Sequence, residues 1–335
     1  MYLKMKLLLL FLLIAGTTSA TTFDLLKAPD YFENFISKFN KHYPDTETRN
    51  YRFKIFKQNL EEINNKNKLN NSAVYSINKF SDLTKNEIVS KYTGLTSAVT
   101  AQNLQVGSNF CKIVYLDSPP GDNLPINFDW RISNKVTSVK DQGACGSCWA
   151  FSALGSLESL YAIKHNKLIN FSEQQLIDCD RVNMGCDGGL MHVAFEQIMN
   201  VGGVMEENDY PYRGVKSRCA ADPSKFVVSL SSCSRYIFQN EDTLKNVLIT
   251  QGPIAMAIDA TSISTYSKGI IKFCDNFGVN HAVLLVGYGT ENNVNYWTFK
   301  NTWGTDWGED GYFRVKRNIN SCGLVNELAS TASIK

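Results

Sequence analysis

The stretch that most constrains the fold of this chain is residues 142–149, Gln-Gly-Ala-Cys-Gly-Ser-Cys-Trp. It places Cys145 and Cys148 three positions apart, directly before apolar residues at helical spacing. If Cys148 lies in the first turn of that helix, unpaired N–H groups and the positive end of the helix dipole favour its thiolate, the reactive form of cysteine. The stretch therefore indicates a nucleophile, while a structural disulfide and a Cys-x-x-Cys redox or zinc pair remain alternatives.

The N-terminus predicts entry into the secretory pathway. Two lysines precede an apolar run at 7–15, and small residues at 18–20 offer a cleavage site, so residues 1–20 are expected to be a signal peptide. That run is too short to cross a bilayer, and no later stretch suits a membrane span. Asn70 and Asn170 begin glycosylation motifs that fit this compartment. We expect the protein in the endoplasmic reticulum, a lysosome-like compartment or outside the cell.

The composition excludes few other classes but is informative about partners and cysteines. The 335 residues are enough for two domains, or for a pro-region followed by one enzyme. Lys and Arg number 34 against 32 Asp and Glu, so no nucleic-acid partner is expected. The nine cysteines are an odd number, and therefore at least one is unpaired within the chain.

The chain changes character near Leu124. Residues 21 to about 100 hold no cysteine and carry one helical stripe, which reads alone as a plain amphipathic helix, at Arg52, Phe56, Asn59, Ile63 and Asn67. Residues 93–105 and 117–122 predict an exposed linker open to proteolysis. After Leu124 the pattern is mainly helical as far as Cys219. It then turns to short apolar strands typical of an antiparallel sheet or barrel, among them 226–230, so the fold class is α+β.

A cysteine nucleophile needs a base and a group that orients the base. Among the four histidines, His281 is the best candidate because it begins an apolar strand at 282–286, at the rim of the expected sheet. Asn301 ends another expected strand and offers an amide oxygen to the imidazole ring. Trp303 would shield that hydrogen bond from water and so strengthen it. A buried strand-end histidine and a turn asparagine remain the alternatives.

Together these motifs resemble the precursors of papain-like cysteine proteases of the cathepsin family. The family's nucleophile signature stands at 145–149, and His281 and Asn301 follow Cys148 by 133 and 153 positions, close to the family's spacing. The stripe resembles the family's inhibitory pro-region helix, with Thr48 in the place of its leading Glu. Residues 76–82 resemble the companion pro-region motif, with Ser in the usual Gly place. Residues 280–311 and 326–331 are similar to the cathepsins of baculoviruses.

The resemblance implies a papain-like fold of two lobes, one helical and one built on an antiparallel β-barrel-like sheet, preceded by a helical inhibitory pro-region. The expected boundaries are 1–20 for the signal peptide, 21–123 for the pro-region and 124–335 for the peptidase domain. It also implies an endopeptidase made as a zymogen, activated when acid removes the pro-region, that degrades host proteins late in viral infection. The expected partners are protein and peptide substrates and the chain's own pro-region. We expect a monomer with no cofactor and no metal.

The same resemblance assigns roles to residues. Cys148 would attack the peptide carbonyl and form a thioester, His281 would hold the thiolate and protonate the leaving amine, and Asn301 would orient His281. Gln142 would join the Cys148 backbone N–H in the oxyanion hole. Gly188 and Gly189 would pair with the substrate backbone. Glu327, at the floor of the apolar subsite, would allow the enzyme to accept Arg there. The expected substrate-binding residues are Gly188, Gly189, Met191, Val279, Ala282, Trp303 and Glu327.

Cysteine pairing is also implied by the resemblance, with bridges Cys145–Cys186, Cys179–Cys219 and Cys274–Cys322. Cys148 is then free. Cys111 lies in the segment expected to be removed at maturation, so a bridge to Cys233 is not expected, and Cys233 is expected to be a buried free thiol.

Two other functions are alternatives for this chain. A thiol–disulfide oxidoreductase would use Cys145 and Cys148, but the chain lacks the βαβ pattern of such enzymes. A catalytically inactive relative acting as a protease inhibitor is disfavoured because Cys148, His281, Asn301 and Gln142 are all present.

Overall fold

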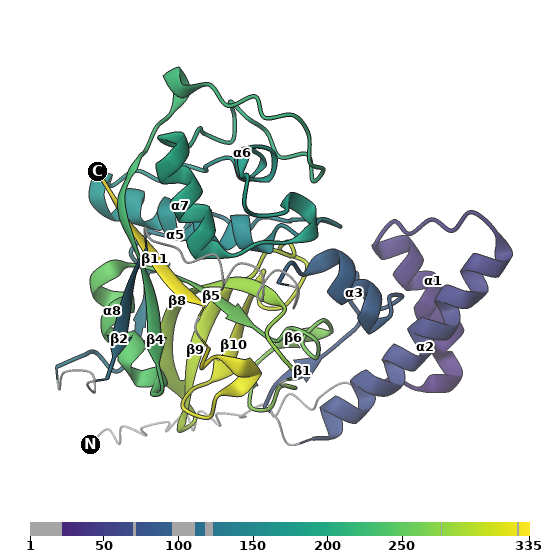
Figure 1. Ribbon diagram of the computed structural model, residues 1–335. Coiled ribbons are helices and arrows are strands. Elements are labelled where there is room, and N and C mark those ends of the chain that lie inside the picture. The colour runs from purple at the N-terminus through teal and green to yellow at the C-terminus, as the bar shows by residue number, and fades with distance from the viewer. Residues whose placement is uncertain (1–21, 70–71, 96–110, 118–122, 276, 327) are drawn as a thin grey trace, which may run out of the picture.

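The computed structural model describes residues 22–69, 72–95, 111–117, 123–275, 277–326 and 328–335. The expected signal peptide, Asn70, Glu327 and the linker residues 96–105 lie outside these ranges. The described chain forms a helical lobe, a sheet lobe and a pro-region whose helices stand to one side of both (Figure 1). None of the described helices combines the length and the apolar character needed to cross a bilayer.

The helical lobe is built around α5 (Cys148–His165), which also contacts the sheet. This helix is rich in small and apolar residues, and all its residues from Cys148 to Ser159 are buried. It ends at Asn166, which adopts a left-handed conformation at φ 53°. α6 (Glu173–Cys179) begins where its capping pattern predicts, because the Ser172 side chain accepts the Gln175 N–H at 3.0 Å. α7 (Met191–Val201) packs against α5.

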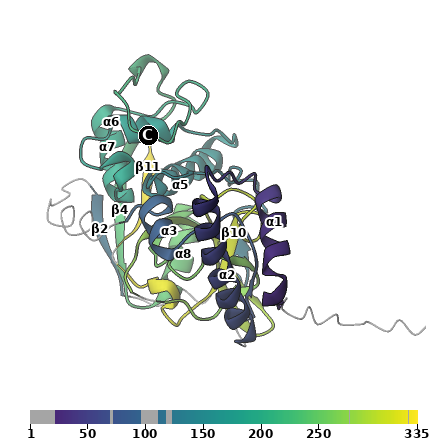
Figure 2. The ribbon, with the colours of Figure 1, turned by 90° about the vertical axis from the view of Figure 1, so that its right-hand side faces the viewer.

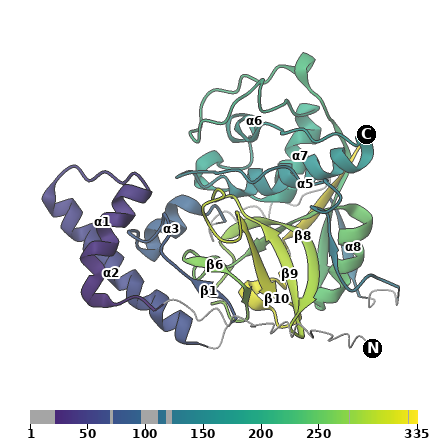
Figure 3. The same cartoon turned by 180° about the vertical axis from the view of Figure 1, so that it is seen from behind.

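Among the described residues, nine strands form the main sheet, in the order β2-β4-β11-β5-β8-β9-β10-β7 with β3 paired to β8. Figure 3 shows β8, β9 and β10 below α5, with α8 (Leu244–Gln251) on the side away from the pro-region. The bounds are β2 Cys111–Leu116, β3 Phe128–Asp129, β4 Leu230–Phe238, β5 Ile254–Ile258, β7 Ile270–Ile271, β8 His281–Glu291, β9 Val294–Lys300, β10 Tyr312–Lys316 and β11 Ala329–Ile334.

The predicted antiparallel sheet is largely present, with two differences. β7 runs parallel to β10, and β2, which precedes Leu124, runs parallel to β4. The strand predicted at 226–230 begins only at Leu230, because residues 223–225 form a 3₁₀ turn and Val228 pairs instead with Val204 through one isolated bridge. Apolar character alone did not reveal that the chain changes partner at this point.

The pro-region helices follow from their caps and their aromatic residues. α1 (Ala28–Lys38) begins with a proline in its first turn, and α2 (Thr46–Lys68) begins at Asp45, whose carboxylate accepts the Thr48 N–H at 2.7 Å. Their facing sides bury the side chains Phe32, Phe35, Phe56 and Leu60. Figure 2 shows both helices in front of the sheet lobe.

The polar members of the helical stripe hold the segment that follows α2. Asn59 donates to the carbonyls of Ser81 and Leu83, both at 2.9 Å, and Arg52 forms a bidentate ion pair with Glu87 at 2.8 and 2.9 Å. Glu87 belongs to the capping box of α3 (Lys85–Tyr92). The stripe is therefore more than a plain amphipathic face, since Asn59 and Arg52 position α3 and the loop before it.

A strand pairing and an aromatic contact are among the interactions that fasten the pro-region to the sheet lobe. β1 (Val74–Tyr75) pairs antiparallel with β6 (Tyr266–Lys268). Phe80 meets the Trp303 indole edge to face at 5.0 Å. After α3, the chain enters the space between the lobes at Thr93, Gly94 and Leu95, all of which are buried. The predicted exposed linker is wrong for these three residues.

Candidate functional site

Cys148 is the first residue of α5 and lies at the junction of the two lobes. Its sulfur is fully buried and accepts the Ala282 N–H at 3.3 Å, from the second residue of β8. The disulfide between Cys145 and Cys186 holds the start of the helix, and the Gly146 N–H donates to the Cys186 carbonyl at 2.8 Å. This arrangement brings the Cys148 sulfur to the end of β8 where His281 stands.

The side chains of His281 and Asn301 are hydrogen-bonded to each other. The His281 Nε2 lies 2.7 Å from the Asn301 Oδ1, which also accepts the Thr302 N–H at 2.8 Å. The amide oxygen is thus an acceptor, so Nε2 carries the proton and Nδ1 is left as the basic nitrogen. No described residue hydrogen-bonds to Nδ1. Trp303 stacks on the imidazole ring at 4.8 Å, and all three side chains are fully buried.

Gln142 lies beside the helix start and touches both lobes. Its side-chain amide donates to the Cys145 carbonyl at 2.7 Å and accepts from the Thr302 hydroxyl at 2.5 Å. Its backbone N–H donates to the Thr302 carbonyl at 2.9 Å. An amide nitrogen carries two hydrogens, so one donor of Gln142 is still available for a ligand.

The pro-region passes directly over Cys148. Gly94 and Leu95 donate their N–H groups to the Asn280 carbonyl at 3.2 and 3.0 Å, and the Gly189 N–H donates to the Gly94 carbonyl at 3.0 Å. A Cβ on Gly94 would lie 3.1 Å from the Cys148 sulfur and would collide with the Gly146 carbonyl. Glycine is therefore required where the backbone crosses the sulfur.

Leu95 shows where a side chain is held. It is buried in one apolar cluster with Met191 and Ala282, and Val279 packs against that cluster. Gly189 contacts the bound backbone, whereas Gly188 makes its backbone hydrogen bonds within its own loop. Trp303, also expected to bind substrate, belongs to another apolar cluster and stacks on His281. Glu327 lies outside the described residues.

Burial under the pro-region changes the ionisation of the pair. Burial raises the pKa of the Cys148 thiol to about 12 and lowers the pKa of His281 to about 4, opposed in the second case by the hydrogen bond to Asn301. At neutral pH both groups are therefore uncharged while the pro-region covers them.

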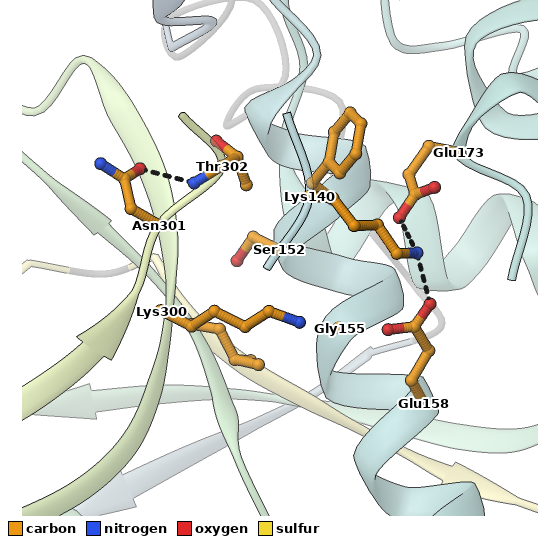
Figure 4. A pocket seen from close by; sticks show the side chains of 10 residues that line it. Lys140, Ser152, Gly155, Glu158, Glu173, Lys300, Asn301 and Thr302 are labelled. Atoms are coloured by element: carbon orange, nitrogen blue, oxygen red, sulfur yellow. Dashed lines mark hydrogen bonds and ion pairs between the residues drawn. The ribbon is translucent and has the colours of Figure 1, made fainter. Parts of the chain in front are cut away.

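A buried charge cluster below the site joins the lobes (Figure 4). Lys140 lies 2.6 Å from the carboxylates of both Glu158 on α5 and Glu173 on α6. Lys300, the last residue of β9, donates to Thr137 at 3.0 Å, and Thr137 in turn donates to Glu158 at 2.5 Å. Burial raises the pKa of Glu173 to about 7 and lowers that of Lys300 to about 8. The cluster stabilises the residue that immediately precedes Asn301.

Tyr212 is a site neighbour that the sequence did not indicate. Its hydroxyl donates to the Gln142 carbonyl at 2.6 Å and lies 2.9 Å from the Ser147 hydroxyl. It comes from an irregular segment with no periodic pattern, and only its aromatic character marks it. It supports Gln142 and the residue before the start of α5.

All nine cysteines lie within the described residues, and Cys148 alone is free. The structure contains the three bridges that the resemblance implies, Cys145–Cys186, Cys179–Cys219 and Cys274–Cys322. The expectation for Cys111 and Cys233 is wrong, because they are bonded to each other. The parallel register of β2 and β4 places these two residues side by side.

Comparison with known proteins identifies this arrangement. Residues 124–332 match the model of the papain family cysteine proteases, and residues 32–88 match that of the cathepsin propeptide inhibitor domain. The chain belongs to the papain family of cysteine proteases. Because it carries the propeptide domain of that family, it is a zymogen that contains its own inhibitory pro-region. Its disulfides and its zymogen organisation are consistent with a secretory or lysosomal protease.

Similar proteins support the same conclusion over the whole chain. The viral cathepsin of Adoxophyes honmai nucleopolyhedrovirus is 67% identical over 98% of this chain and 100% of its own length. That of Autographa californica nuclear polyhedrosis virus is 58% identical with the same coverage. The solved digestive procathepsin L2 proteinase of Tenebrio molitor superposes with a TM-score of 0.82 at 33% identity, covering 91% of this chain and 99% of that one. The predicted family, two-lobe fold and enzyme class are confirmed.

The oxidoreductase alternative is not favoured. Cys145 is bonded to Cys186, so the structure contains no Cys145–Cys148 dithiol. The alternative of an inactive relative acting as a protease inhibitor is not favoured either, because the propeptide domain is joined to a peptidase domain of the same family.

Proposed function

We propose that this enzyme cleaves peptide bonds through a thioester on Cys148, with His281 as base and acid and Asn301 as the residue that orients His281. The observation that carries the proposal is the contact of the Cys148 sulfur with the second residue of β8, 3.3 Å from Ala282 N, beside the His281–Asn301 pair at 2.7 Å. His281 Nδ1 takes the thiol proton and later gives it to the leaving amine. Water then hydrolyses the thioester, with His281 again as base.

The oxyanion that forms at the attacked carbonyl needs donors that are already in place. Cys148 begins α5, so its backbone N–H has no partner within the helix. The free amide hydrogen of Gln142 provides a second donor from the neighbouring loop. Such donors act in a water-excluded site, where each contributes more than it would in water.

The path of the pro-region explains why Cys148 does not cleave it while it covers the active site. Gly94 crosses the Cys148 sulfur and Leu95, the next residue along the chain, fills the apolar pocket. In a substrate, the side chain in that pocket belongs to the residue before the one at the scissile bond. The pro-region therefore runs opposite to a substrate, and its carbonyl is held by Gly189 instead of by the oxyanion donors.

We propose that acid releases the pro-region because its carboxylates become protonated. The ion pair with Arg52 lowers the pKa of Glu87 to about 2, below its usual value of 4.5. A carboxylate with a depressed pKa stabilises the folded pro-region fully above its usual pKa, and this contribution is lost as pH falls from about 4.5 towards 2. Lys41–Asp82 at 2.8 Å and Lys79–Asp141 at 2.5 Å are further ion pairs, the second linking the pro-region to the peptidase domain. Autoprocessing should accelerate below about pH 5.

We propose that the apolar pocket that holds Leu95 accepts Leu, Val or Phe from a substrate. Leu95 is buried there in the same apolar cluster as Met191 and Ala282. Glu327 would add acceptance of Arg by placing a carboxylate at its floor. Turnover of Phe-Arg and Arg-Arg fluorogenic peptides by wild type and Glu327→Gln tests this, and an unchanged preference would refute it.

The remaining proposals concern the whole precursor. We propose a signal peptide at 1–20, a pro-region at 21–123, a peptidase domain at 124–335, and a monomer that acts on protein and peptide substrates. Asn170 is exposed, as a glycosylated residue must be, and Asn70 is the second acceptor. The similarity to viral cathepsins supports a role in degrading host proteins late in infection.

Labelling of the active site separates these functions. The precursor is incubated in acid and treated with an epoxide inhibitor specific for cysteine proteases, with Cys148→Ser as the matched control. Labelling at Cys148 with loss of peptidase activity supports the proposal. Reduction of insulin disulfides without peptide cleavage would instead identify an oxidoreductase, and a precursor that stays uncut in acid with Cys148 intact would contradict acid activation.

A further inference from the structure

One segment of the pro-region lies far from the inhibitory helices. β2 pairs with β4 along its whole length in parallel register, from Cys111 opposite Cys233 to Leu116 opposite Phe238. It forms the outer edge of the main sheet, on the side away from α1 and α2 (Figures 1 and 2). This strand is therefore held by the peptidase domain independently of the contacts that close the active site.

The attachment is covalent as well as hydrogen-bonded. Cys111 and Cys233 are bonded across 122 positions of sequence, with their Cα atoms 4.5 Å apart. Both are buried, at 4% and 2% exposure, and the Cys111 N–H donates to the buried Glu196 carboxylate of α7 at 3.3 Å. Val114 and Leu116 pack against the core of the sheet lobe. A buried bridge between two paired strands is shielded from exchange with external thiols.

The order of features along the chain separates inhibition from attachment. Gly94 and Leu95 occupy the active site, Cys111 makes the bridge, and the proposed peptidase domain begins at Leu124. A cut between Leu95 and Cys111 frees the active site without touching the bridge. A second cut between Asp117 and Leu124 removes the peptide connection but leaves the sulfur–sulfur bond intact.

We propose that the mature enzyme is a two-chain protein, in which a short light chain containing β2 remains joined to the peptidase domain through Cys111–Cys233. The inference rests on the proposed removal of the pro-region. The bond forms when the two thiols lose two electrons and two protons to a disulfide donor, which becomes a dithiol. A dithiol reductant reverses the reaction and releases the light chain.

Retention has a structural consequence for the sheet. Without β2, the backbone N–H and C=O groups of β4 would form an exposed edge, which favours association with other chains. Cys233 would become a free thiol on that edge. The light chain covers both, while its outward residues Ile113 and Tyr115 are 46% and 64% exposed. Because β2 contacts β4 and α7 at the far edge, it leaves the Cys148 site open.

The test compares masses before and after reduction. Free thiols of the acid-activated wild-type enzyme are alkylated, and its intact mass is measured without and with a dithiol reductant. We expect the unreduced mass to exceed that of the reduced heavy chain by a peptide that contains at least Cys111–Leu116, and this peptide to appear on reduction. Cys111→Ser and Cys233→Ser should each give only the heavy chain under both conditions, with peptidase turnover equal to wild type.

Other outcomes distinguish a failure of the two-chain proposal from a failure of the proposed protease function. An active wild-type enzyme whose unreduced mass is that of the heavy chain alone overturns the inference and leaves the protease intact. Alkylation of both Cys111 and Cys233 in the unreduced precursor also overturns it; a metal bound there would then implicate the Cys111–Glu196–Cys233 group, whose ligand atoms lie within 4.8 Å of one another. If acid produces no cleavage, the proposed activation fails, and pepsin digestion of the Cys148→Ser precursor gives the same mass comparison for the bridge.

Discussion

Replacing Gly94 with Ala should open the zymogen without touching the peptidase domain. The new Cβ would collide with the Gly146 carbonyl and press on the Cys148 sulfur at 3.1 Å. Because the first obstacle is backbone at the start of α5, where the Cys145–Cys186 bridge holds the chain, the pro-region is the part that must move.

The size of the effect follows from the contacts that such a movement breaks. Gly94 and Leu95 take part in three backbone hydrogen bonds of 3.0–3.2 Å, to Asn280 and Gly189. Losing two of them costs about 1–3 kcal/mol at about 0.5–1.5 kcal/mol each. Partial exposure of Leu95 adds about 1 kcal/mol, a fraction of the full value of about 1.5–3 kcal/mol. The total of roughly 2–4 kcal/mol corresponds to a population of open molecules roughly 30- to 1,000-fold larger.

The assay is alkylation of Cys148 in the intact precursor at neutral pH, in short pulses, quantified on the uncut protein. A covered thiol reacts only through open molecules, so the labelling rate follows the open population. Lys91→Ala, on the exposed face of α3 in the same segment, is the matched control and should label like wild type. If Gly94→Ala labels at the wild-type rate, the backbone does not cross the sulfur as described and the reasoning is refuted.

Three further predictions concern ionisable groups and the oxyanion site. Lys140→Met leaves the buried carboxylates of Glu158 and Glu173 without their cation, so the free energy of unfolding in urea should fall by about 3–5 kcal/mol at pH 7. The loss should be smaller at pH 5, where the raised pKa of Glu173 allows that carboxyl to be protonated, and an equal loss at both pH values would contradict the assignment. Glu87→Gln removes the carboxylate that acid must protonate, so autoprocessing should begin at a higher pH than in wild type; an unchanged pH profile would exclude Glu87 from the acid response. Gln142→Ala should lower kcat by about 100- to 1,000-fold with little change in folding, as judged by thermal melting, and a wild-type kcat would remove Gln142 from the oxyanion site.

The sequence predicted the parts of the structure that depend on local pattern or on a recognisable signature. The helix behind Cys148, the cap at Ser172 and the strand after His281 all follow from spacing and residue type, and the structure brings these segments together. The location of Asn301 at the end of a strand was readable in the same way.

The features that escaped prediction depend on contacts between distant segments. Gly94 lies in a run rich in Thr, Ser and Ala that has the composition of a linker, and only the collision with Gly146 shows why glycine stands there. Lys140 and Glu158 carry charges, which favour a surface location unless a partner is known, and their partners are many positions away. The Cys111–Cys233 bridge requires a parallel pairing across 122 positions, for which no sequence pattern exists.

The contacts of Trp303 make its intrinsic fluorescence a reporter of whether the pro-region is bound. Its indole stacks on His281, yet its N–H donates to the Tyr92 carbonyl at 2.9 Å and its ring meets Phe80, both from the pro-region. Departure of the pro-region therefore strips one face of a fully buried indole and leaves its N–H to water. The emission of this tryptophan should shift to longer wavelength as the zymogen opens. A Trp303→Phe variant identifies the share of the total fluorescence that comes from Trp303. Opening of the zymogen can then be followed in real time without a substrate or a label.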